Sequence, residues 1–285
     1  MKFNTLIVGL VAIGLTACVS IPQSTAPKSG LTSNKAIKIN ENILDKDIVP
    51  EHSYPVAKTG FQLVQTQGGS VFLGPILGSM NISRNSKEMA SKIKSDFFGV
   101  VPYELSKKAL LETGFIEDDN ARLDVTPFAF LQKCDDNSYR LSLVYHVKDL
   151  QSKWFGRYTY HIDKPIKVND FPAALNDQYY NQEFSYGADK LAQIMKKDFA
   201  GQLPVNGKKY NVGSLNLIGE KMGGMGIYTQ PEELFIQNAT VIEETNDTVI
   251  VRMKGLLKAD PAFHGLSFGV HYFNKSILHT FEPTK

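Results

Sequence analysis

Ser267 is the hydroxyl whose neighbours come closest to a catalytic pattern. It lies in Gly265-Leu266-Ser267-Phe268-Gly269, which matches the G-x-S-x-G sequence of a nucleophile elbow, where a strained turn exposes the serine for acyl transfer. The context does not fit, because neither a helix-like stretch nor an aspartate follows Ser267, and Glu282 comes after both nearby histidines. The sequence therefore favours a glycine-flanked turn that leads into a strand.

Two pairs of histidines are candidates for metal or hydrogen-bond chemistry. A hairpin that turns near Lys153 would place His146 and His161 opposite one another on the polar face of two strands, where imidazoles can bind a metal ion. Because no third ligand is evident, we expect these histidines to face solvent. His271 and His279 share a face only if the loop between them has three residues, and the sequence leaves that register open.

Aromatic and methionine side chains outside the expected cores form a candidate interaction surface. They share large, adaptable apolar surface, and they are Trp154, Phe155, Tyr179, Tyr180, Met222 and Met225. The Trp-Phe pair falls at the tip of an expected hairpin, the Tyr pair precedes an expected long helix, and the methionines flank glycines of an expected loop. Such side chains suit contacts with glycan, lipid or protein, and the alternative is ordinary packing or a plain loop.

The first eighteen residues carry the most specific chemical signal. Lys2 supplies a short positive region, and the apolar run from Leu6 to Leu15 is too short to span a bilayer, as is typical of a secretory leader. The run ends in Leu15-Thr16-Ala17-Cys18. An ordinary leader ends in a small-x-small cleavage site and does not need a cysteine at the cut, so Cys18 is the discriminating residue.

Leu15-Thr16-Ala17-Cys18 resembles the lipobox of bacterial lipoproteins. The resemblance implies that residues 1–17 are a signal peptide, and that Cys18 carries acyl chains, such as palmitate, on its sulfur and its freed nitrogen. Each buried methylene contributes about 0.8 kcal/mol, so three chains hold a protein firmly on a membrane without a spanning segment. Val19 stands where inner-membrane lipoproteins of enteric bacteria usually carry Asp, which implies the outer membrane if the source cell has one. We expect the chain to lie on the periplasmic face, and the sequence leaves the leaflet open.

Composition excludes some partners and one source of stability. The chain has 31 basic and 29 acidic side chains and no basic block, so we do not expect it to bind nucleic acid. It has two cysteines, and once Cys18 is acylated only Cys134 remains. An intrachain disulfide is then impossible, and stability must come from packing.

Residues 18–60 have the composition of a tether. They are rich in Ser, Thr, Asn, Lys and Pro, with isolated apolar residues. This predicts a lipidated N-terminus and a flexible linker with a reach on the order of 35 Å. A short helix over residues 35–46 that docks on the folded body is the alternative.

Residues 61–204 carry the periodicities of an α/β domain. The strand expected at 139–148 alternates apolar and polar side chains, which predicts one face in the core and one in water. The helix expected at 181–200 places its apolar side chains on one stripe. In chain order we expect a strand at 70–78, a helix from near Asn85, a helix from Pro102 to a cap at Gly114, strands at 122–132, 139–148 and 156–162, and the helix at 181–200.

After residue 205 the pattern changes to strands and turns. Strands are expected at 210–218, 234–243, 248–254, 267–273 and 277–281. The predicted fold class is therefore α+β, a two-layer α/β sandwich of order β-α-β-β-β-α followed by a small all-β C-terminal domain at 205–285. The C-terminal strands could also be a β extension of the first domain.

The element order between about residues 70 and 201 resembles that of envelope accessory lipoproteins. Examples are the N-terminal domain of TolB, LptE, and the auxiliary lipoproteins of lipid-trafficking ABC transporters. The resemblance lies in residues 106–115, the strands around Tyr145 and Tyr158, and the helix at Lys190. It covers element order only and does not extend to the C-terminal strands.

These observations predict a membrane-anchored lipoprotein that is a non-enzymatic accessory in cell-envelope biogenesis or transport. We expect it to bind an envelope protein or lipid partner and to need no cofactor and no metal. The alternatives are a cell-envelope hydrolase whose site is assembled from residues distant in sequence, and a surface-exposed lipoprotein antigen.

Overall fold

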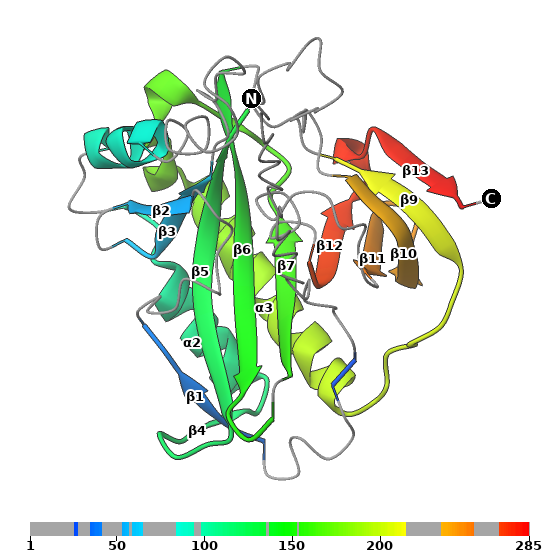
Figure 1. Ribbon diagram of the computed structural model, residues 1–285. Coiled ribbons are helices and arrows are strands. Elements are labelled where there is room, and N and C mark those ends of the chain that lie inside the picture. Colours follow the sequence, from blue (N-terminus) through cyan, green and yellow to red (C-terminus); the bar gives the residue numbers. More distant parts are fainter. Residues whose placement is uncertain are drawn as a thin grey trace, which may run out of the picture.

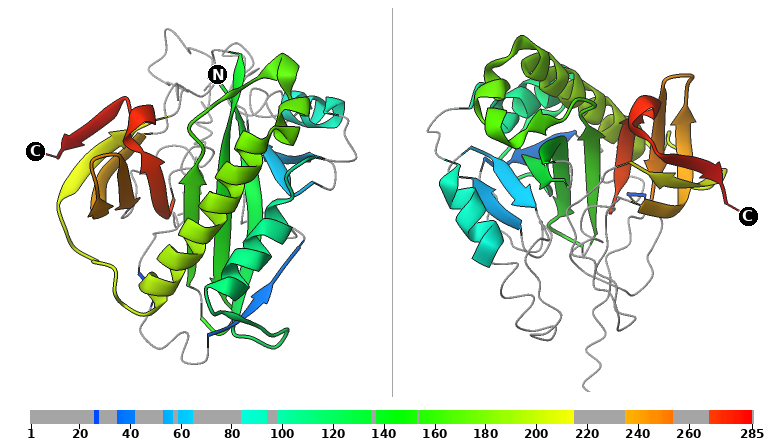
Figure 2. Two further views of the ribbon diagram at one scale, coloured as in Figure 1. Left: turned by 180° about the vertical axis from the view of Figure 1, so that it is seen from behind. Right: turned by 90° about the horizontal axis from the view of Figure 1, so that it is seen from above.

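Figure 1 shows the chain as a computed structural model, which describes residues 26–27, 35–41, 53–56, 59–64, 84–93, 98–134, 137–152, 154–214, 235–253 and 268–284. These residues form helices and a large mixed sheet, which confirms the mixed α/β class. The view from behind in Figure 2 shows α2 and α3 crossing one face of the sheet. The expected strand at 70–78 lies outside the described residues.

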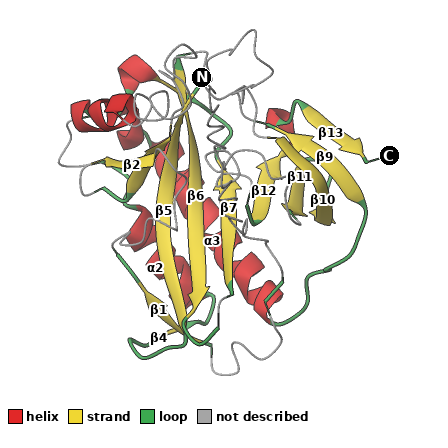
Figure 3. Cartoon of the chain, viewed as in Figure 1, coloured by secondary structure: helices red, strands yellow, loops and turns green. Residues whose placement is uncertain are grey.

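Figure 3 distinguishes the strands from the helices. The strands are β1 (Ala36–Ile39), β2 (Ser53–Val56), β3 (Phe61–Val64), β4 (Ile116–Glu117), β5 (Leu123–Lys133), β6 (Ser138–Asp149), β7 (Phe155–His161), β8 (Ile166–Lys167), β9 (Lys209–Gly213), β10 (Phe235–Glu244), β11 (Thr248–Arg252), β12 (Val270–Asn274) and β13 (Thr280–Pro283). The helices are α2 (Pro102–Glu112), α3 (Gln178–Phe199) and the 3-10 turns η3 (Val168–Asp170), η4 (Ala173–Asn176) and η5 (Lys275–Ile277). Residues 84–92 are also helical.

The long antiparallel strands β5, β6 and β7 form the centre of the sheet. The order across it is β13-β9-β10-β11-β12-β7-β6-β5-β1-β4, with β2 beside β3, β3 beside β5 and β8 beside β6. Tyr145 of β6 lies opposite Pro127 of β5 and Tyr158 of β7. These central strands are the ones that the sequence predicts at 122–132, 139–148 and 156–162.

Both faces of the central strands are buried. On the face toward the helices, Leu143 and Tyr145 pack in the main core, and the Tyr145 hydroxyl donates to the Ala188 carbonyl of α3 at 3.1 Å. On the opposite face, called the second face below, Ser142 is 0% and His146 is 4% exposed. The expectation that this face of the strand meets water is therefore wrong over Ser142 to His146, and only Lys148 near the end of β6 is exposed.

Both long helices lie where the sequence predicts them. Pro102 occupies the first turn of α2, where its missing N–H costs nothing, and Gly114 follows the helix with a φ of +96°, which suits glycine. The Asp177 side chain accepts a hydrogen bond from the Tyr179 amide at 2.9 Å and caps α3. These local signals fix where α2 and α3 begin and where α2 ends.

β1 corrects the expectation of a tether over residues 18–60. β1 pairs in parallel with β5 on one side and β4 on the other, and β2 pairs with β3. Ile37 and Ile39 of β1 are buried, and each such side chain contributes about 1.5–3 kcal/mol when it leaves water. Residues 36–39 and 53–56 of this range form strands, and the alternative helix is not found at residues 35–41.

The C-terminal strands continue the same sheet. β12 pairs in parallel with β7, where His271 lies beside Thr159, and β11, β10, β9 and β13 follow outward. Within the described residues, this pairing joins the strands that precede residue 205 to those that follow it. The expected C-terminal strands are present as an extension of the first sheet, and an independent C-terminal domain is not confirmed.

A buried ion pair reinforces this connection on the helical face. Nη2 of Arg252, from β11, lies 2.5 Å from Oδ1 of Asp198, near the end of α3. The Tyr158 hydroxyl of β7 donates to the other Asp198 oxygen at 2.8 Å. Arg252 and Asp198 are 1% and 3% exposed, so removing one partner would leave the other charged and buried. This set of residues ties β11 to both α3 and β7.

Arg252→Met is expected to lower the free energy of unfolding by about 3–5 kcal/mol, because the Asp198 carboxyl group would stay buried without its ion-pair partner. The double variant Arg252→Met, Asp198→Leu should recover much of that loss, since no uncompensated charge remains. Urea unfolding at pH 7 measures both effects. Lys197→Met is the matched control, because Lys197 pairs with Glu243 at the surface, and its loss should stay below about 1 kcal/mol.

Candidate functional site

The second face of the sheet carries a chain of buried polar side chains. It begins at Gln132 of β5 and crosses Ser142 of β6 and His161 of β7 to His271 of β12, and we call these residues the histidine chain. Each of the four is at most 1% exposed. Apolar side chains of the second core surround the chain, among them Phe130, Val144, Val251 and Phe273. Because the surroundings are apolar and exclude water, each of these polar groups would be costly to bury without a hydrogen bond.

The histidine chain is continuous. The Ser142 hydroxyl oxygen lies 3.3 Å from Oε1 of Gln132 and 2.9 Å from Nδ1 of His161. On the far side of the ring, Nε2 of His161 lies 3.0 Å from Nδ1 of His271. A neutral imidazole has one N–H donor and one acceptor nitrogen, so a single proton lies between the two rings and their tautomers are linked.

Burial keeps the His161 ring uncharged at neutral pH. His161 lies parallel to the Phe273 ring, with centroids 4.3 Å apart, and stacks against His271 at 5.3 Å. Burial holds the pKa of the His161 imidazole well below its ordinary value, and the neighbouring His271 lowers this pKa further. At neutral pH His161 therefore acts as an uncharged hydrogen-bond link between Ser142 of β6 and His271 of β12.

A buried cation lies on the same face. The Arg157 guanidinium sits between the rings of Phe130 and Phe268, at 5.6 and 5.5 Å from their centroids. Burial lowers the pKa of this guanidinium to about 9. Thr159, between Arg157 and His161 on β7, is 1% exposed, and its hydroxyl has no hydrogen-bond partner. The Arg157 guanidinium is therefore a buried positive charge on the same face as the histidine chain.

Ser142 and His161 are the residue types of a nucleophile and its base, but their surroundings differ from those of a catalytic site. Ser142 and His161 are within hydrogen-bond reach, as in an acyl-transfer site. Both are at most 1% exposed, and the group behind the imidazole is another histidine in place of a carboxylate that would stabilise an imidazolium. The geometry supports a hydrogen-bond link and gives no support to hydrolysis at this chain.

The predicted pairing of His146 with His161 is wrong. The β6–β7 hairpin turns earlier than expected, so His146 lies opposite Arg157, and His161 lies opposite Ser142. Both histidines are buried, which also corrects the expectation that they face solvent. In the part of the chain that the structure describes, no three His, Cys, Asp or Glu side chains are grouped to hold a metal ion.

His271 and His279 do not share a face. β12 and β13 are separated in the sheet by several strands, so the loop between them makes no hairpin. His279 lies at the surface, where its amide bonds the Gly213 carbonyl at 2.8 Å. The alternation of side chains along β6 places Ser142 and His146 on one face, and this pattern is the sequence signal that could have located part of the histidine chain. The role of His271 had no such signal.

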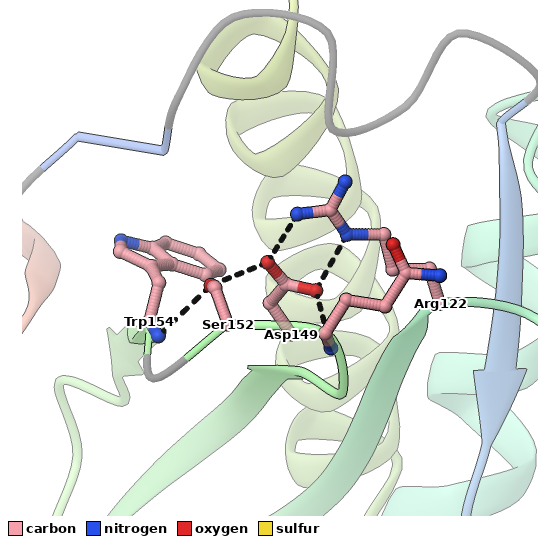
Figure 4. A network of polar contacts seen from close by, with 5 residues as sticks. Arg122, Asp149, Ser152 and Trp154 are labelled. Atoms are coloured by element: carbon pink, nitrogen blue, oxygen red, sulfur yellow. Dashed lines mark hydrogen bonds and ion pairs between the residues drawn. The ribbon is translucent and has the colours of Figure 1, made fainter.

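The tip of the β6–β7 hairpin holds a charged network (Figure 4). Nε and Nη2 of Arg122 donate to the two oxygens of Asp149, each at 2.6 Å. The Ser152 hydroxyl and the Gln151 amide also donate to this carboxylate, at 2.5 and 3.0 Å. These bonds, the Arg122 pair foremost, hold the pKa of Asp149 well below its ordinary value.

Trp154 and Phe155 are used for packing at this hairpin. The Trp154 ring lies 5.8 Å from the Phe199 ring of α3, and it covers Gly156 so closely that a Cβ there would come within 2.9 Å of it. Phe155 lies 5.2 Å from the Phe268 ring. The sequence places this pair at a hairpin tip as observed, but both rings are partly buried against the body.

The tyrosine pair divides between core and surface. Tyr180 is 2% exposed and donates to the Pro165 carbonyl at 3.4 Å. Tyr179 is half-buried, and the Lys164 ammonium lies 5.3 Å from its ring centroid. The other expected site residues, Cys18, Met222 and Met225, lie outside the described residues, as does Ser267.

Comparisons of the chain with protein-family models, with curated proteins and with solved structures found no match. None of the helices in the described part of the chain combines the length and apolar character needed to cross a bilayer.

Asp149→Asn is expected to reduce the acid sensitivity of stability. Because the pKa of Asp149 is lower in the folded than in the unfolded chain, its contribution is present above about pH 4 and is lost as pH falls further. Thermal melts between pH 6 and 2.5 should show a smaller fall in Tm for the variant than for the wild-type protein. The exposed Asp119 provides the control, since Asp119→Asn should leave the pH profile unchanged. Parallel profiles for Asp149→Asn and wild type would contradict this assignment.

Proposed function

We propose that this chain is a bacterial envelope lipoprotein, anchored through acyl chains on Cys18 at the periplasmic face of the outer membrane. The observation that carries the proposal is the sequence Leu15-Thr16-Ala17-Cys18 at the end of an apolar leader. Its role is that of a non-enzymatic accessory that binds a protein or lipid partner during envelope biogenesis or transport.

The surface of α3 supports a binding role. Tyr179 and Tyr186 are seven residues apart, so they lie two turns apart on one side of the helix, and Tyr186 is 44% exposed. Lys164 and Lys190 lie 5.3 and 5.0 Å from their ring centroids. We call these four residues the tyrosine surface. Its combination of apolar rings and positive charge suits an acidic protein segment or an anionic lipid head group.

The two-layer sandwich at 61–204 remains part of this proposal. In it, the helices form one layer and the central strands the other, while the C-terminal β region at 205–285 extends the sheet past β7. The parallel pairing of β12 with β7 supports such an extension. The accessory would then present the tyrosine surface from its helical layer.

Cys18→Ala should abolish acylation and membrane attachment. Cells expressing the wild-type chain and fed an alkyne analogue of palmitate should label the protein, and the protein should fractionate with membranes. The variant should do neither, because the sulfur that accepts the acyl chain is missing. Cys134→Ala is the matched control, since it removes the other cysteine, which is buried, and should keep both label and membrane fraction. Labelling of Cys18→Ala would refute the anchor.

A photo-crosslinking amino acid in place of Tyr186 should capture the partner in intact cells. Irradiation is expected to give a discrete adduct, because this side chain is exposed on the tyrosine surface. Mass spectrometry then distinguishes a protein adduct from a lipid adduct. The same replacement at Leu150, which is 55% exposed at the hairpin tip, is the control and should give no such adduct. Equal adducts at both positions, or none at Tyr186, would reject the tyrosine surface as the binding site.

A further inference from the structure

Strands β9 to β13 join the rest of the sheet along one edge of β7. In the sheet order, β12 is their innermost strand and β7 is its neighbour. Val270, His271 and Tyr272 pair with Tyr158, Thr159 and Tyr160 in parallel register. This seam is shorter than the β5–β6 pairing, which runs the full length of β5. The seam therefore depends on side chains as well as on backbone hydrogen bonds.

Each face of the seam has one buried polar link across it. On the helical face, Arg252 of β11 pairs with Asp198, which also accepts from Tyr158 of β7. On the second face, His161 of β7 bonds His271 of β12. The first link is an ion pair and the second runs through the uncharged ring of His161, so the two respond differently to acid.

We propose that the His161–His271 pair is a pH-sensitive latch, which holds strands β9–β13 against β7 at neutral pH and releases them in mildly acidic solution. The latch is a property of the fold and does not depend on where the protein resides or what it binds.

Protonation of the imidazoles destabilises the closed latch because of where the two rings lie. One added proton places a positive charge in a site that is at most 1% exposed. A second proton turns both facing nitrogens into donors only 3.0 Å apart, which removes the bond between them. Opening the seam returns both rings to water, where they accept protons with an ordinary pKa near 6.5.

The charges around the pair also oppose protonation. Among the described residues, the charged or titratable side chains on this face are Arg140, His146 and Lys148 of β6, Arg157 of β7, Asp124 at the far end of β5, and Tyr210 of β9. β11 contributes the apolar Val249 and Val251. The Asp163 carboxylate, which accepts from the Asn274 amide at 2.7 Å, lies on the helical face beside Glu183 and Tyr160. Arg157 is the buried charge nearest along β7, and its sign disfavours an imidazolium.

The sign of the pH effect follows from this difference between the closed and open states. Because the pKa of His161 is lower in the closed form, closure is favoured above about pH 6.5 and weakens as pH falls. Between pH 7.5 and 5.5, the opening constant should rise about tenfold if one imidazole gains a proton, and about 100-fold if both do.

Hydrogen exchange of the full-length protein, measured by mass spectrometry at pH 7.5 and 5.5, tests the latch. After correction for intrinsic exchange, protection in residues 248–253 and 268–274 should fall by about 10–100-fold, while protection in residues 139–148 of β6 should be unchanged. An equal response in the two regions, or no response in either, would overturn the proposal.

Two variants separate the latch from general acid sensitivity. His271→Asn should already show low protection in the C-terminal strands at pH 7.5 and no further fall at pH 5.5. His279→Asn is the matched control, because His279 is exposed, and it should keep the wild-type response. A wild-type response in His271→Asn would overturn the proposal. If His271→Asn does not fold, nitrogen chemical shifts of the wild-type imidazoles decide, since protonated His161 in a closed seam at pH 5.5 would contradict the latch.

Discussion

Strand β7 is bonded at both edges and buried on both faces, and the rest of the structure depends on that position. β6 runs antiparallel along one edge and β12 parallel along the other. Tyr158 points to Asp198 and the helices, while His161 points to the second face. β7 therefore contacts three parts of the structure at once: the central strands through β6, the C-terminal strands through β12, and the helices through Asp198 of α3.

The polar links beside β7 also specify its register. In a strand, successive side chains point to opposite faces, so a slip of one residue in β12 would turn His271 away from His161. Such a slip would leave Nε2 of His161 buried without the His271 ring that it bonds, at a cost that an apolar interface would not impose. Polar side chains on the second face thus reduce the apolar area that is buried, but they allow only one register between β7 and β12, which are far apart in sequence.

The sequence predicted what neighbouring residues determine and missed what distant ones determine. Alternation along residues 139–148, Pro102 and Gly114 at the ends of α2, and the apolar stripe over 181–200 located the strand and the helices, because these signals are local. His161 and His271 are 110 residues apart, and no local pattern in either segment indicates that the two are in contact. Alternation also told which side chains share a face of β6 but not that this face is covered. For the same reason, Trp154 was placed correctly while its packing against Phe199 was not foreseen.

The position of β1 has a mechanical consequence. β1 lies between β4 and β5 and runs parallel to both. Only 17 residues separate Cys18 from Ala36, a length of chain that spans at most about 60 Å. With the proposed anchor on Cys18, a pull on the folded body would be transmitted along β1. The backbone bonds on both its edges would then be loaded together in shear, and not opened one after another as in peeling. An anchor attached through an inner strand would therefore resist forces that would strip an edge strand from the sheet.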